Sequence, residues 1–78
     1  MRGVWRCDQL GRTYFSSDDG DEIFVVLEGE VEIEVVATGE KLVYRPGDIC
    51  SWTKGTPTIW DIRKPMKKVF VIADAKPA

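Results

Sequence analysis

Residues 21–62 read DEIFVVLEGEVEIEVVATGEKLVYRPGDICSWTKGTPTIWDI, and this stretch decides the fold. Glutamates alternate with branched apolar residues over positions 30–35, a period of two that is typical of a strand with one buried face. Residues 23–27 are a continuous apolar run, which favours a strand covered on both faces. Turn-forming residues separate the runs at Gly39, at Pro46-Gly47-Asp48 and around Gly55. The stretch therefore predicts a series of short β-strands joined by tight turns.

The rest of the chain continues the same pattern. No window shows helical periodicity with caps, and the apolar runs predict about six to eight strands, near 3–7, 11–16, 22–28, 30–37, 41–45, 48–52, 58–62 and 67–73. A tight corner is expected over residues 28–30, and a turn over Arg63-Lys64-Pro65. Short strands at this spacing favour a single all-β domain over residues 1–78, a small antiparallel jelly-roll barrel with a frayed tail at 74–78.

Composition narrows the classes of function. The chain carries 11 basic and 13 acidic residues, a net charge of −2, and this balance argues against nucleic acid or a membrane surface as a partner. The sequence shows no signal-peptide pattern and no long apolar run, so we expect a cytoplasmic protein with Cys7 and Cys50 as free thiols. A domain this short buries only about 60% of its unfolded surface. That favours a homodimer, held partly through the strand that contains Val4 and Trp5.

Several motifs, taken in order, resemble the cupin family. Glu22, six residues and Gly29 match the end of the first cupin motif, with LEGEV at 27–31 as its corner between strands. Gly47, five residues and Thr53-Lys54-Gly55 match the opening of the second motif, with threonine in place of the usual proline. Residues 3–73 as a whole are similar to very small cupins related to ureidoglycine aminohydrolase and to ethanolamine-utilisation barrel proteins. The resemblance implies a jelly-roll barrel and, in typical members, a metal held by three histidines and a glutamate.

The metal ligands that the resemblance implies are missing, because the chain contains no histidine. Glu22 keeps the family's glutamate, and the last metal histidine would fall at Thr58, whose neutral hydroxyl is a poor ligand. The two histidines of the first motif would fall at Ser16 and Asp18 or at Phe15 and Ser17. A single carboxylate does not hold a transition metal tightly, so we expect no metal and no other cofactor.

An unusual metal set stays open at this point. Asp18, Glu22 and Cys50, with Asp61, would supply one carboxylate-rich site. The acidic run at 18–22 is, however, more typical of a solvated turn.

Strand parity and the second motif select the candidate site. Thr58 and Trp60 share the face that would carry the last metal ligand, and Phe24 shares the face of Glu22. Aromatic walls with a few polar groups are typical of a small-ligand pocket. We expect a small-molecule ligand to contact six residues: Tyr14, Glu22, Phe24, Trp52, Thr58 and Trp60.

Three hypotheses for function remain. The first is a metal-free barrel that binds a small molecule. The second is an enzyme resembling the ureidoglycine aminohydrolase relatives, with Glu22 as its base or sole retained ligand. In the third, side chains plug the barrel and leave a structural or interaction module. The basic cluster of Lys64, Lys67 and Lys68 is expected in a solvated loop rather than in a phosphate site.

Overall fold

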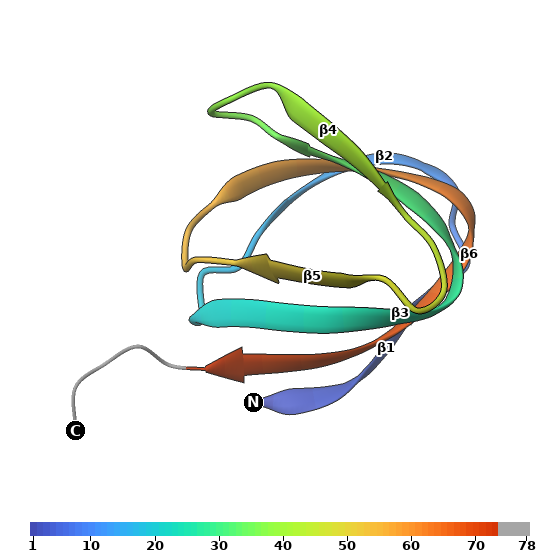
Figure 1. The fold of residues 1–78 in the computed structure, drawn as a ribbon, viewed down its shortest axis with the longest axis horizontal. Helices are drawn as coiled ribbons and strands as arrows, with labels where there is room; N and C mark the ends of the chain where they lie inside the picture. Colours follow the sequence, from blue (N-terminus) through green and yellow to red (C-terminus); the bar gives the residue numbers. More distant parts are fainter. Residues whose placement is uncertain (74–78) are drawn as a thin grey trace.

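The computed structural model describes residues 1–73, which form one six-stranded antiparallel sheet (Figure 1). Its strands are β1 (Arg2–Cys7), β2 (Gly11–Ser16), β3 (Asp21–Val35), β4 (Glu40–Tyr44), β5 (Ile49–Trp52) and β6 (Pro57–Ala73). Within these residues no helix is long and apolar enough to cross a membrane. The expected all-β antiparallel fold is confirmed, and the predicted frayed tail at 74–78 lies outside the described residues.

Two long strands form the centre of the sheet. β3 and β6 pair along their whole lengths, from Asp21 opposite Ala73 to Val35 opposite Thr58. The shorter β1 and β2 pair with the other edge of β6, and β4 and β5 pair with the other edge of β3. In Figure 1 the sheet curls: β2 and β4 lie above, β1 and β5 lie below, and β3 and β6 curve from one side to the other. One face of the sheet therefore encloses an interior.

Two expected strand boundaries are wrong. The corner over residues 28–30 lies inside β3, and Arg63-Lys64-Pro65 is extended strand inside β6 rather than a turn. Pro65 is tolerated in β6 because it lies where the β3–β6 register is irregular and between the ladders to β2 and β1. A missing N–H at such a position breaks no regular ladder hydrogen bond.

Gly29 is the reason that β3 can continue. The register with β6 shifts around it, as in a β-bulge, and Gly29 has a φ of 91°. A Cβ at this position would overlap the carbonyl oxygen of Pro65. Before the bulge the even-numbered residues of β3, such as Phe24, are buried, and after it the odd-numbered ones, such as Val31, are buried. The bulge thus turns both halves of β3 toward the same interior.

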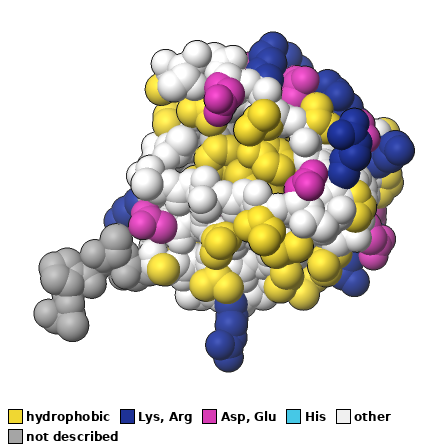
Figure 2. All heavy atoms as spheres, in the orientation of Figure 1, with side chains coloured by type: hydrophobic (Ala, Val, Ile, Leu, Met, Phe, Trp, Pro, Cys, Tyr) yellow, Lys and Arg dark blue, Asp and Glu magenta, His cyan; other side chains and the backbone are white. Residues whose placement is uncertain are grey.

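The apolar run at 23–27 is covered on one face only, contrary to expectation, because the six strands form a single curled sheet. Val25 of this run belongs to an outer aliphatic row that crosses β1, β6, β3 and β5. Neighbouring members of the row pair in register, in the order Val4, Val69, Val25 and Ile49. Val4 and Ile49 expose 61% and 63% of their surface. Figure 2 shows several hydrophobic side chains gathered at the surface of the face in view.

The inner face carries the hydrophobic core. Its buried members come from β3, β5 and β6: Phe24, Val26, Val31, Ile33, Cys50, Trp60, Ile62 and Met66. Cys50 in this core and the half-buried Cys7 are both free, as expected.

Two loops meet at the end of the sheet where β3 begins. The backbone N–H of Gly55 donates to the carbonyl oxygen of Ser17 at 2.8 Å, and the N–H of Lys54 donates to Asp21 Oδ1 at 2.7 Å. The turn of the second motif is thereby tied to the segment that precedes Glu22. These bonds hold together the end of the curled sheet that contains the candidate site.

Candidate functional site

Four of the six expected site residues lie together inside the curled sheet. Glu22, Phe24, Thr58 and Trp60 are each at most 2% exposed. Strand alternation on β3 and β6 points all four side chains inward, as the sequence indicated.

The other two expected residues lie elsewhere. Trp52 is half-buried, packs against the core and pairs with Glu22 across β5 and β3. Tyr14 requires a correction: it is 66% exposed on the outer side of β2, and its neighbour Phe15 is the residue that packs against the core. Alternation defines two faces of a strand, but it does not say which one meets the interior.

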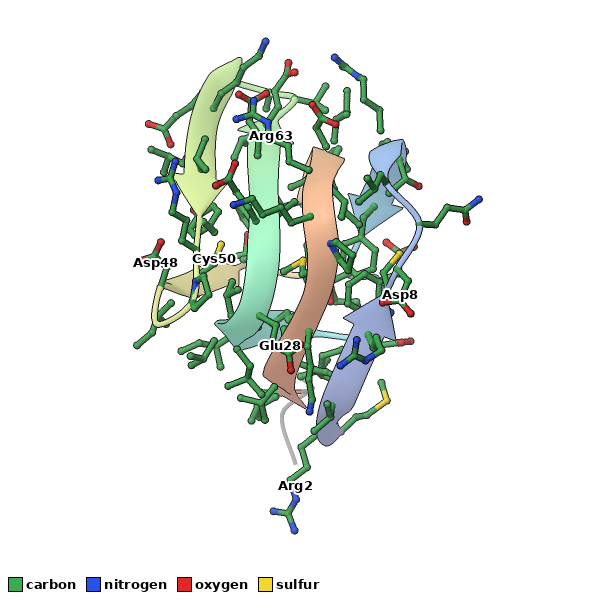
Figure 3. The ribbon with its side chains drawn as sticks, turned by 90° about the vertical axis from the view of Figure 1, so that its right-hand side faces the viewer. Arg2, Asp8, Glu28, Asp48, Cys50 and Arg63 are labelled. Atoms are coloured by element: carbon green, nitrogen blue, oxygen red, sulfur yellow. The ribbon has the colours of Figure 1, made fainter. Side chains whose placement is uncertain are left out.

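An ion pair lies at the centre of this cluster. Lys68 Nζ is 2.7 Å from Glu22 Oε2, and the two side chains are 4% and 1% exposed. Lys68 does not lie in the expected solvated loop, because β6 continues through Pro65 and both Met66 and Lys68 are buried on its inner face. The adjacent Lys67 lies on the outer face, where its Nζ is 3.9 Å from Glu28, a residue visible in front of β6 in Figure 3.

Five aromatic rings surround the Lys68 ammonium. The distances from Nζ to the ring centroids are 4.5 Å for Phe24, 4.7 Å for Trp60, 5.1 Å for Trp5, 5.4 Å for Phe15 and 5.7 Å for Phe70. A cation within about 6 Å of a ring face is attracted by the negative potential of the ring. Rings from β1, β2, β3 and β6 thus replace part of the water that the ammonium loses.

Burial dominates the electrostatics of the pair. Loss of water lowers the pKa of the Lys68 ammonium from its usual 10.5, while the hydrogen bond to Glu22 acts in the opposite direction. Within the described residues, two buried side-chain atoms lack a hydrogen-bond partner: Glu22 Oε1, an acceptor, and Trp52 Nε1, a donor. Leaving such a group unsatisfied costs about 1–3 kcal/mol. A hydrogen-bond donor next to Glu22 Oε1 would therefore remove this cost and stabilise the protein.

A cavity of about 230 Å³ opens beside the pair. Its walls include the rings of Trp5, Phe15, Trp60 and Phe70, and the segment 16–19 contributes to its lining. Glu22 and Lys68 also line it. Because the pair is buried whereas Asp18 and Asp19 are exposed, the pair lies at the inner end and the acidic segment at the rim. A second, more open hollow of about 320 Å³ also reaches Glu22 and is bounded by Trp52.

The positions of the family's metal ligands are engaged in other interactions. Thr58 Oγ1 donates to the carbonyl oxygen of Phe15 at 2.6 Å and accepts the indole N–H of Trp60 at 3.0 Å. Ser17 Oγ donates to the carbonyl oxygen of Gly20 at 2.9 Å. Across residues 1–73, no three side chains of His, Cys, Asp or Glu lie close enough together to hold a metal ion.

The residues present do not fit a cupin metal. The ammonium of Lys68 places a positive charge beside Glu22, the one retained ligand, and a metal cation there would meet electrostatic repulsion. The alternative metal set of Glu22 with Asp18, Cys50 and Asp61 is not assembled, because the described residues contain no such cluster.

The ammonium and three of the aromatic rings at the site were not foreseen: Lys68, Trp5, Phe15 and Phe70. A signal for Lys68 was present, because counting in steps of two from Thr58 through Trp60 and Met66 reaches Lys68. The proline at position 65 obscured it, since proline normally marks a turn.

Comparisons with known proteins agree with this architecture. The sequence model of the EutQ-like cupin domain family matches residues 2–70 of this chain. A DUF861 family protein from Thermotoga maritima superposes with a TM-score of 0.82 at 25% identity, over 92% of this chain and 78% of that one. A putative ethanolamine utilization protein Q from Salmonella typhimurium gives 0.78 at 24% identity, over 96% of this chain and 58% of that one.

A third solved structure, ectoine synthase from P. lautus, gives a TM-score of 0.75 at 25% identity, over 86% of this chain and 48% of that one. No curated protein matches the chain by sequence. Three further structural neighbours, at 16–20% identity, are described as proteins of unknown function. The family match spans nearly all of the described strands, and the chain therefore belongs to the EutQ-like cupin domain family.

Proposed function

We propose that the protein binds a small molecule in the aromatic cavity, with the Glu22–Lys68 pair at the inner end of the site. One observation carries this proposal: a cavity of about 230 Å³ ends at a buried ion pair whose Glu22 Oε1 has no hydrogen-bond partner. Concave apolar sites with a few convergent polar groups are the usual form of ligand pockets. The cavity favours this function over a plugged structural module.

The lining indicates the chemistry of the ligand. Aromatic walls from Trp5, Phe15, Trp60 and Phe70 favour an apolar or planar body. Glu22 would accept a hydrogen bond from a polar end of the ligand, and Lys68 would donate one to it. The volume is below the range of about 300–1,000 Å³ that drug-sized ligands occupy, which favours a metabolite of one small ring or a short chain. A small-molecule role is also supported by the structural neighbour named ectoine synthase.

Titration with benzyl alcohol tests the proposal, because this probe joins one ring to one hydroxyl. We expect saturable quenching of tryptophan fluorescence in the wild-type protein, since Trp5 and Trp60 line the cavity. Phe15→Ala should weaken binding about tenfold, because a ring-to-ring contact contributes about 0.5–1.5 kcal/mol beyond its buried area. Tyr14→Ala is the matched control, since it removes an aromatic ring from the outer side of the same strand.

Two results would count against the proposed function. One is the absence of saturable binding at millimolar benzyl alcohol. The other is equal weakening by Phe15→Ala and Tyr14→Ala, which would place the probe outside the cavity.

A further inference from the structure

Lys68 is the one lysine of residues 1–73 that is buried, and its side chain lines the cavity. Binding alone does not require a primary amine there, because a hydroxyl or amide would also offer a hydrogen bond. A primary amine differs from those groups in that it can add to a carbonyl carbon and form a covalent intermediate. Lysines that do so are desolvated by apolar surroundings, and five rings within 5.7 Å provide such surroundings here.

Glu22 supplies the second group that this chemistry needs. Imine formation moves protons from the amine to the departing oxygen, so a carboxylate next to the nitrogen assists it. Glu22 Oε2 lies 2.7 Å from Lys68 Nζ, within the range for direct proton transfer. Oε1 of the same carboxylate has no hydrogen-bond partner in the protein, and Glu22 itself lines the cavity.

We propose that Lys68 forms an imine with a small aldehyde or ketone held in the aromatic cavity, with Glu22 transferring the protons. The inference rests on the ligand pocket proposed above and adds a reaction to it. The ammonium first gives a proton to Glu22, and the nitrogen lone pair then attacks the carbonyl carbon while the C=O π pair moves to oxygen. Transfer of a second nitrogen proton to that oxygen gives the neutral carbinolamine.

The second half of the reaction restores Glu22. Its proton goes to the carbinolamine hydroxyl, which leaves as water while the nitrogen lone pair forms the C=N bond. The net change is ammonium plus carbonyl compound to iminium plus water, with the same total charge and no oxidant or reductant. The product nitrogen is again a cation, so the rings and carboxylate that stabilise the ammonium also stabilise the iminium.

Reductive trapping tests the inference on the intact wild-type chain. Benzaldehyde is the probe, sodium cyanoborohydride converts any imine to a stable benzylamine, and mass spectrometry of proteolytic peptides locates the benzyl group. Lys67 is an internal control in the same molecules, because it lies next to Lys68 but on the outer face beside Glu28. We expect Lys68 to be benzylated at least about tenfold faster than Lys67, given the hundredfold or larger effect of a positioned acid–base group.

Two further measurements assign the reaction to the cavity. Excess benzyl alcohol should slow trapping at Lys68 and leave Lys67 unchanged. Glu22→Gln, checked for folding by circular dichroism, should slow trapping at Lys68 alone, because an amide cannot carry the proton. An unchanged rate in this variant would overturn the role of Glu22.

The outcomes separate this inference from the proposed function. If benzyl alcohol binds but Lys68 is trapped no faster than Lys67, imine formation is refuted and the ligand pocket stands. If benzyl alcohol does not bind and Lys68 is not trapped, both are refuted.

Discussion

Replacing Lys68 by methionine should destabilise the protein more than replacing Glu22 by glutamine, although both residues belong to one ion pair. Lys68→Met leaves the Glu22 carboxylate, which is 1% exposed, without a partner for either oxygen. Breaking a buried pair in this way costs about 3–5 kcal/mol. A domain of 78 residues has a total stability of about 4–12 kcal/mol, so this single change removes a large part of it.

Glu22→Gln should cost less because the ammonium keeps its aromatic neighbours. Five ring centroids remain 4.5–5.7 Å from Nζ, and each such contact is worth about 0.5–1 kcal/mol or more. The glutamine oxygen can also accept the hydrogen bond that the carboxylate accepted. We expect a loss of about 1–3 kcal/mol for this variant.

Urea unfolding at pH 7, followed by tryptophan fluorescence, measures these differences and their coupling. The double variant Glu22→Gln/Lys68→Met should be about 2 kcal/mol more stable than Lys68→Met alone, because no charge remains buried. Lys67→Met is the matched control and should change stability by no more than about 0.5 kcal/mol, as exposed pairs do. The reasoning is refuted if Lys68→Met costs less than about 1 kcal/mol, or if the effects of the two single changes simply add.

Three further predictions concern pH, the bulge and assembly. Burial raises the pKa of the Cys50 thiol to about 11 from 9.0, so the unfolded chain ionises first as the pH rises. Between pH 9 and 11 the wild type should therefore lose up to about 2–3 kcal/mol of its free energy of unfolding relative to Cys50→Ala. The same pH dependence of urea unfolding in the two proteins would contradict this. Gly29→Ala should cost more than about 3 kcal/mol, because it adds a steric overlap with strand β6 to backbone strain at a φ of 91°. Gly39→Ala, at a φ of 72° in open space, should cost only about 1 kcal/mol. Equal urea midpoints for Gly29→Ala and Gly39→Ala would exclude the overlap. We also expect a homodimer formed through the outer aliphatic row. Light scattering at micromolar concentration should report a dimer that Val69→Lys dissociates and Leu42→Lys, on β4, does not, whereas a wild-type monomer would refute the assembly.

The strands and the central part of the site were accessible from the sequence because they depend on local alternation. A period of two on β3 and β6 placed Phe24 with Glu22 and Thr58 with Trp60, and all four side chains face the interior. Of these four, Glu22 and Trp60 line the cavity. The motif glycines marked positions that need unusual backbone geometry, and Gly29 indeed has a positive φ. What this glycine does, a bulge inside one long strand rather than a corner between two, follows from its contact with Pro65 on β6.

The choice between Tyr14 and Phe15 shows where alternation stops being informative. Both are aromatic neighbours on β2, and the sequence assigns them to opposite faces without naming the inner one. The pairing of β2 with β6 decides it, because Phe15 lies directly opposite Thr58, whose side chain is already inside.

The sequence by itself determined an all-β antiparallel fold, because alternation and turn residues follow from residue type and spacing, and its motifs resembled those of cupins without the metal histidines. Only the tertiary structure decided what lies beside Glu22. Lys68 reads as a surface lysine in a basic turn, and it becomes an interior cation because β6 continues through Pro65 and brings it to Glu22, 46 residues away. A lysine is buried only when a partner compensates for the lost water, and that partner exists only once β3 and β6 have paired.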